Sequence, residues 1–278
     1  MQAQRTHTLT TTDGATIGGT VHGQGPPLVF VHGIIGDGDL DFQALLPHLT
    51  DRFTCHLPST RGRGLSGDHP DHTRGRLVDD IIAYVDSIGE PAALVGFSSG
   101  GAMALSAAAQ SETTTAVAVH EPALTALLDE QQRATFGETV ARVGEHVAAG
   151  RLASAAHTFA GYVCNDPEIA ALEQAGYLEA AGRYTPVLVN DIQQLRQSEG
   201  PTAADPEVLG RIAAPLLVLH GPETATPWFT ACVHHLADHV PEVRIREIPG
   251  AGHYAPLTHP EELAEALADF FEPARQPA

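Results

Sequence analysis

Four short runs of apolar residues recur along the chain, at 28–31, 92–95, 116–119 and 216–219. Three of the runs directly follow a proline, and the run 116–119 is stopped by His120-Glu121-Pro122. All four are too short for a helix, which is typical of buried strands. Between most of these runs lie segments in which apolar residues recur with helical spacing, such as 73–88. Alternating strands and helices predict an α/β fold, with a mostly parallel, doubly wound sheet covered by helices on both faces.

Two regions depart from this alternation. Residues 7–11 and 16–22 are rich in Thr and Val and are separated by Asp13-Gly14, which predicts a β-hairpin. Residues 123–200 carry no strand pattern and are rich in Ala, Glu and Leu, which predicts three or four helices. We therefore expect a core of residues 1–122 and 201–278 and an inserted helical cap of residues 123–200. An insertion there would lie over the carboxyl edge of the sheet, where open α/β sheets place their sites.

The sequence Gly96-Phe97-Ser98-Ser99-Gly100 follows the apolar run 92–95 and precedes a segment of small, helix-forming residues. It predicts a sharp turn from strand to helix with Ser98 at the bend. Glycines at positions 96 and 100 remove side chains that would clash in such a turn. Ser98 would then stand above the sheet edge, at a helix N-terminus that favours developing negative charge.

Three further loops follow predicted strands: His32-Gly33-Ile34, the polar loop from Arg61 to Ser66, and Pro249-Gly250-Ala251-Gly252-His253. With the Ser98 turn, these motifs stand in one fixed chain order. In this respect the chain resembles an α/β-hydrolase with a helical cap, and the resemblance covers all of it except the cap.

The resemblance implies roles for individual residues. Ser98 would be the nucleophile and His253 the general base. Backbone amides of Ser99 and Ile34 would form the oxyanion hole, and His32 would brace the loop that carries Ile34. We expect the substrate-binding surface to include Gly33, Phe97 and Trp228. No cofactor and no metal are implied.

The acid of the triad is left open by the sequence. Family members usually place an Asp three residues after the Gly that ends the penultimate strand, but here that residue is Thr224, which carries no charge. Glu223 is adjacent and has a longer side chain. Glu121 ends the strand after the nucleophile strand, and Pro122 would fix its direction, so we favour Glu121. The third alternative is that the site has no functional acid.

The amino-acid composition argues against some classes of binding partner. With 34 acidic and 15 basic residues the formal charge is −19, which argues against nucleic acid and anionic membranes as partners. The N-terminal residues show no targeting signal, so we expect a cytoplasmic protein. The three cysteines are far apart and form no disulfide framework or CxxC metal pattern. A small-molecule substrate is the expected partner, and a homodimer is left open.

These observations predict a serine hydrolase that acts on an ester, thioester or lactone of a small, largely apolar molecule through an acyl-Ser98 intermediate. One alternative is related carbonyl chemistry at the same site, namely C–C hydrolysis, perhydrolysis or a natural-product cyclase step. The other is a ligand-binding protein with this fold, which the departure at Thr224 keeps open.

Overall fold

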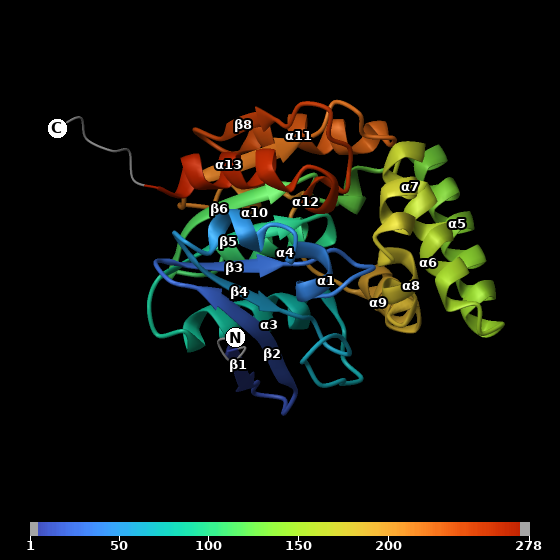
Figure 1. Ribbon diagram of the computed structural model, residues 1–278, viewed down its shortest axis with the longest axis horizontal. Helices are drawn as coiled ribbons and strands as arrows, with labels where there is room; N and C mark the ends of the chain where they lie inside the picture. Colours follow the sequence, from blue (N-terminus) through green and yellow to red (C-terminus); the bar gives the residue numbers. More distant parts are fainter. Residues whose placement is uncertain (1–4, 273–278) are drawn as a thin grey trace.

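One eight-stranded sheet organises the chain, of which a computed structural model describes residues 5–272 (Figure 1). The strand order is β1-β2-β4-β3-β5-β6-β7-β8. β1 and β2 form the predicted antiparallel hairpin, β2 also pairs antiparallel with β4, and all later pairs are parallel. The strands are β1 Arg5–Thr10, β2 Thr16–Gly23, β3 Pro27–Val31, β4 Thr54–Pro58, β5 Ala92–Phe97, β6 Thr114–His120, β7 Leu216–His220 and β8 Arg244–Glu247.

Burial explains why the apolar runs became the central strands. Every residue of β3 and β5 is buried, as expected for parallel strands covered by helices on both faces. β3 lies between β4 and β5, so the chain reverses its direction of growth across the sheet at β3. Such a reversal opens a crevice at the carboxyl ends of the strands. The predicted α/β architecture is confirmed.

Helices cover the sheet in two groups. α2 packs against α13, whereas α3, α4, α10 and α11 form a continuous series of contacts. α13 is amphipathic and buries Leu263 and Leu267 against the core. The core helices are α1 Gly38–Phe42, α2 Leu46–Leu49, α3 Arg74–Ser87, α4 Ser99–Ala108, α10 Pro206–Leu209, α11 Pro227–His239, α12 Ala255–Thr258 and α13 Pro260–Phe271.

The segment of residues 123–200, between β6 and α10, is helical, as expected, and stands beyond the strand tips at the right of Figure 1. It contains five α-helices rather than three or four, because Gly176 adopts a left-handed φ of 68° and separates α7 from α8. The elements are η1 Thr125–Leu127, α5 Glu130–Ala148, α6 Leu152–Val163, α7 Asp166–Gln174, α8 Tyr177–Gly182 and α9 Thr185–Gln197.

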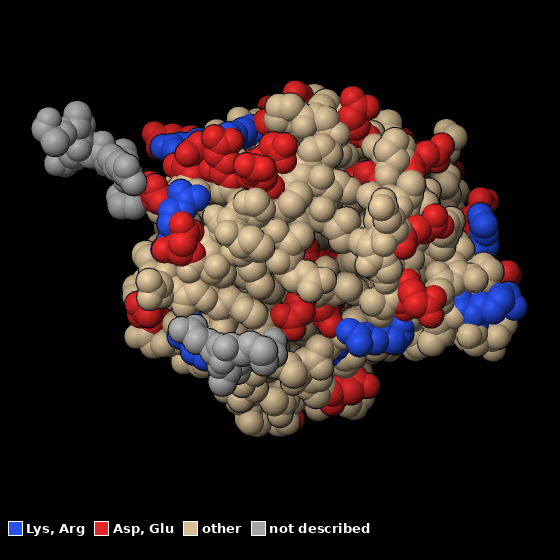
Figure 2. Space-filling view, in the orientation of Figure 1, with Lys and Arg blue, Asp and Glu red and all other residues tan. Residues whose placement is uncertain are grey.

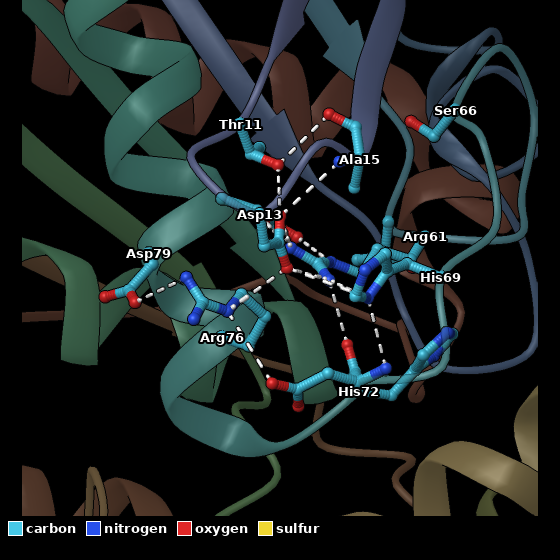
Figure 3. Close-up of polar contacts among 12 residues, drawn as sticks. Thr11, Asp13, Ala15, Arg61, Ser66, His69, His72, Arg76 and Asp79 are labelled. Carbon is cyan, nitrogen blue, oxygen red and sulfur yellow. Dashed lines mark hydrogen bonds and ion pairs between the residues drawn. The ribbon is translucent and has the colours of Figure 1, made fainter.

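A buried arginine fixes the loop that follows β4 (Figure 3). The Arg61 guanidinium is inaccessible to solvent and forms two hydrogen bonds to each of two carboxylates, those of Asp80 and Asp13. The hydrogen bonds from Arg61 hold the pKa of Asp13 well below its usual range. Arg61 thereby joins the β1–β2 turn, the loop after β4 and helix α3.

A second buried carboxylate joins the cap to the core. Asp41 accepts a hydrogen bond of 2.8 Å from the backbone N–H of Gly33 and one of 2.5 Å from the Tyr177 hydroxyl of α8. Burial raises the pKa of Asp41 to about 7, although both hydrogen bonds favour the charged form. Nearby, the Tyr184 hydroxyl donates to Asp37. Polar contacts from the cap thus reach the loop after β3.

Acidic side chains outnumber basic ones in this chain, 34 to 15. In the view of Figure 2, Asp and Glu side chains are spread over the face and Arg side chains form a few separate groups. Among residues 5–272, no helix combines the length and the apolar character that a membrane crossing requires.

Replacing Arg61 by Ala should destabilise the fold by about 3–5 kcal/mol, because Asp80 would remain buried without its counter-charge. Arg246→Ala is the control: Arg246 is partly exposed and pairs with exposed Asp269, so its loss should cost at most about 1 kcal/mol. Guanidinium denaturation measures both values. Equal losses for the two variants would contradict the assigned role of Arg61.

Asp41→Asn should change how stability depends on pH. The folded pKa of Asp41, about 7, lies above the unfolded value, so the folded state retains a proton that the unfolded state has lost. Wild-type stability should therefore fall as pH rises from about 4 to about 7. In that range, the free energy of unfolding of the Asn variant should rise relative to that of the wild type by up to about 1.4 kcal/mol per pH unit.

Urea denaturation of both proteins across this range provides the measurement. Asp238→Asn, at an exposed position of α11, is the control and should leave the pH dependence unchanged. A constant difference in stability between the Asp41→Asn variant and the wild type would show that Asp41 does not titrate there.

Candidate active site

Ser98 stands at a strained turn between β5 and α4. Its φ of 55° is unusual for a residue with a side chain, and such strain is found at functional positions. The flanking glycines are sterically required. A Cβ at Gly100 would lie 2.1 Å from the carbonyl oxygen of Val31, and one at Gly96 would lie 2.6 Å from the Cα of Gly101. The predicted strand–turn–helix arrangement is therefore present.

Two hydrogen bonds connect Ser98, His253 and Glu121. His253 Nε2 lies 3.1 Å from Ser98 Oγ, and His253 Nδ1 lies 2.8 Å from Glu121 Oε2. The three residues come from the end of β5, the loop after β8 and the end of β6. Because Glu121 accepts from Nδ1–H, the imidazole presents an unprotonated Nε2 to the Ser98 hydroxyl.

The Glu121 carboxylate is fully buried and has two further donors. The Gly221 N–H donates to Oε1 and the Thr224 hydroxyl donates to Oε2, each at 3.1 Å. Burial opposes ionisation of Glu121, but the hydrogen bond from His253, the electrostatic interaction with the His120 and His253 imidazoles and the Gly221 N–H together lower its pKa. Glu121 also has a positive φ of 42°. Thr224, at the position where an Asp was expected, therefore helps to hold the carboxylate of Glu121.

Glu223 is not the partner of His253. Its side chain is exposed, and its carboxylate forms no hydrogen bond with any residue that the structure describes. The backbone directs it outward: the Glu223 N–H donates to the carbonyl of Ala251, and its own carbonyl accepts from Asn165 of the cap. The alternative that placed the triad acid at Glu223 is corrected on this ground.

The loop that carries His253 is held on several sides. The Phe229 ring stacks on the imidazole, with ring centres 4.2 Å apart. Burial lowers the pKa of His120 to about 4, so this neutral imidazole donates through Nε2 to the carbonyls of Gly252 and His253. The cap residue Glu168 accepts a 2.6 Å hydrogen bond from the Tyr254 N–H. These contacts fix the position of the His253 ring.

The loop after β3 brings Ile34 to the same site as Ser99. Neither of their backbone N–H groups donates a hydrogen bond to another residue within 5–272. His32 braces the loop: its Nε2 accepts from the Thr60 N–H at 2.9 Å, and its Nδ1 therefore donates to the Gly33 carbonyl at 2.7 Å. Burial lowers the pKa of His32 to about 4, in agreement with a neutral ring.

A cavity of about 480 Å³ opens above Ser98, between the core and the cap, within the size range of small-molecule sites. Gly33 and Trp228, two of the three residues expected at the substrate-binding surface, line this cavity. Phe97 does not: its ring is buried beneath Gly33 and 4.9 Å from the His253 ring, because the strand directs it away from the cavity. The other apolar lining residues include Ile34, Leu77, Met103, Leu124, Leu128, Phe136, Phe159, Tyr162, Ile192 and Phe229.

The sequence reasoning missed three polar residues at this site. Arg63 is buried, donates to the Ile34 carbonyl at 2.8 Å and pairs with the Asp191 carboxylate of α9 at 2.7 Å. Glu168, the third, contacts the His253 loop. Two of the three lie in the cap, where the sequence offers no motif. Arg63 belongs to the Arg61–Ser66 motif, whose polar pattern was the available signal.

Within residues 5–272, His, Cys, Asp and Glu side chains form no group of three or more that could hold a metal ion.

Comparisons with known proteins show the family of this chain. Residues 28–266 match the model of the alpha/beta hydrolase family. Over 94 residues the chain is 36% identical to pyrrolizixenacetamide deacetylase of Xenorhabdus hominickii, covering 32% of this chain and 34% of that protein. It is 40% identical over 89 residues to pimeloyl-[acyl-carrier protein] methyl ester esterase of Stenotrophomonas maltophilia, covering 32% and 33%. These matches span about a third of each relative.

Similarity over nearly the full length is found with a solved structure. An alpha/beta hydrolase from Sphaerobacter thermophilus has a TM-score of 0.77 and 28% identity, with 96% of this chain and 100% of that chain covered. The family match covers most of the residues, and the fold and the strand-end motifs agree with it. The chain therefore belongs to the alpha/beta hydrolase family and is an enzyme of that family.

Proposed function

We propose that the protein is a serine hydrolase that cleaves esters, thioesters or lactones of small, largely apolar molecules. The observation that carries this proposal is the hydrogen-bonded series Ser98–His253–Glu121 at the base of the cap cavity. Two similar proteins whose names include deacetylase and methyl ester esterase support acyl chemistry in general.

In the proposed first half-reaction, Ser98 Oγ attacks the substrate carbonyl while His253 Nε2 takes the hydroxyl proton. The buried Glu121 carboxylate stabilises the resulting imidazolium. The N–H groups of Ser99 and Ile34 donate to the developing oxyanion, at the positive end of α4. The tetrahedral intermediate collapses to acyl-Ser98, and His253 returns the proton to the leaving alcohol or thiol.

In the second half-reaction, a water molecule takes the place of the leaving group. His253 removes its proton, the hydroxide attacks the acyl carbonyl, and the same amides stabilise the second oxyanion. Collapse of this intermediate releases the carboxylic acid and restores the Ser98 hydroxyl. The apolar walls of the cavity would bind the body of the substrate and exclude other water.

Ser98→Ala should abolish turnover of 4-nitrophenyl esters, with a loss on the order of 10³-fold or more, because the nucleophile is absent. A fluorophosphonate probe should label Ser98 in the wild type and leave the Ala variant unlabelled, as detected by intact-protein mass spectrometry. Circular dichroism is the control for folding. If the wild type turns over no ester and takes up no probe, the proposed serine-hydrolase mechanism is wrong.

Glu121→Gln should lower kcat by about 10²-fold or more, because a neutral amide can neither fix the imidazole tautomer nor stabilise the imidazolium. Glu223→Gln is the matched control, since the Glu223 side chain is exposed and outside the site, and its activity should stay near that of the wild type. Thermal melting separates a catalytic loss from unfolding. Comparable activity in two folded variants would remove Glu121 from the proposed triad.

A further inference from the structure

The charge of the cap cavity is opposite to that of the molecule. Four arginines, Arg63, Arg74, Arg133 and Arg196, line the cavity, whereas Asp191 is the one carboxylate among its lining residues that the structure describes. Arg63 and Asp191 pair with each other. Three arginines therefore remain at the cavity of a protein whose formal charge is −19.

We propose that Arg74, Arg133 and Arg196, here named the arginine rim, bind a carboxylate at the end of the substrate that is remote from the scissile carbonyl. An apolar segment would separate the two groups. This inference rests on the proposed ester hydrolysis and specifies its substrate class.

Contacts between neighbouring residues place the three arginines on one side of the cavity. Arg74 Nη2 donates to the Leu195 carbonyl at 3.2 Å, and Leu195 precedes Arg196 in α9. The Arg196 guanidinium carbon lies 5.4 Å from the centre of the Phe136 ring. Phe136 follows Arg133 by three residues in α5, so the two share one face of that helix. The rim thus runs from α3 past the end of α9 to α5.

No carboxylate among the described residues neutralises the charge of the rim arginines. Arg74 and Arg133 donate to backbone carbonyls and Arg196 contacts an aromatic ring, and within residues 5–272 none of the three pairs with a carboxylate. Arg74 is also the first residue of α3, where the positive end of the helix dipole disfavours a cation. Helix stability therefore does not account for an arginine at this position.

The rim and Ser98 lie at different depths. Ser98 is 8% exposed, whereas Arg133 and Arg196 are exposed and Arg74 is half-buried. Mainly apolar side chains line the cavity. A substrate that places its carbonyl at Ser98 and its carboxylate at the rim would therefore bury an apolar segment. The positive rim would also draw an anion towards a cavity in an otherwise acidic surface.

The test compares esters of equal length with and without a terminal carboxylate, with acid release followed by pH-stat titration. One series consists of hemiesters of dicarboxylic acids, with the charge on the acyl side. The second consists of acetyl esters of hydroxy acids, with the charge on the alcohol side. We expect a higher kcat/KM for the charged members of at least one series, with an advantage that decreases in about 1 M salt.

Arg74→Gln, Arg133→Gln and Arg196→Gln should each lower kcat/KM for the charged ester by about 2- to 5-fold, and the triple variant by about 10-fold or more. Neutral esters should be unaffected. Arg142→Gln is the control, because Arg142 is exposed on the same helix as Arg133 but does not line the cavity.

Equal kcat/KM values for charged and neutral esters in both series would overturn the inference. A third comparison, of acyl-coenzyme A with acyl-pantetheine, tests the other source of anionic charge. If the arginine variants lower kcat/KM for acyl-coenzyme A alone, the rim binds a phosphate and the carboxylate inference is overturned.

The inference can fail separately from the proposed function. Turnover of neutral esters with labelling of Ser98, but without any effect of the arginine variants, would overturn the inference alone. Calorimetric binding of the hemiester to the Ser98→Ala variant, with and without the triple arginine change, requires no turnover. Loss of binding with the triple change supports the rim, and unchanged binding overturns it.

Discussion

The buried carboxylate of Glu121 is the constraint on which the site depends. A charge removed from solvent is tolerated only when donors surround it, and Glu121 has three, from His253, Gly221 and Thr224. These donors belong to the loop after β8 and to the segment after β7, so one carboxylate at the end of β6 ties three loops together. The distance from His253 to Ser98 therefore depends on where Glu121 is held. Thr224 cannot ionise and so cannot supply the negative charge, but its hydroxyl can donate a hydrogen bond to the Glu121 carboxylate.

The cap contributes to the site as well as covering it. Glu168 contacts the loop that carries His253, Asp191 pairs with the arginine that holds the Ile34 carbonyl, and Tyr177 donates to Asp41, which binds the Gly33 N–H. Each contact is buried and polar, so displacement of the cap would leave unpaired groups in the core. We infer that docking of the cap and alignment of the loops around Ser98 are energetically coupled.

Charge is distributed unevenly over the molecule. On the face drawn in Figure 2, acidic side chains are more widespread than basic ones. In the interior, Arg61 is buried between two carboxylates (Figure 3), and further arginines border the cavity. Arg61 and Arg63 lie two residues apart in one loop and have different roles: Arg61 joins the hairpin to α3, and Arg63 joins the cap to the loop after β3. The planar, permanently charged guanidinium suits both, because each arginine must satisfy several acceptors at once.

The sequence by itself determined the parts of this protein whose causes are local. Apolar runs identified the central strands, and glycine spacing identified the turn at Ser98, because strand burial and steric clearance act within a few residues. Only the tertiary structure showed that Glu121, and not Glu223, contacts the His253 imidazole. That choice depends on β6 lying between β5 and β7 and on which way each side chain leaves the backbone. Phe97 was misplaced for the same reason, since a one-residue step reverses the direction of a side chain in a strand. The cap contacts of Glu168 and the composition of the cavity arise between segments far apart in sequence, so no local pattern specifies them.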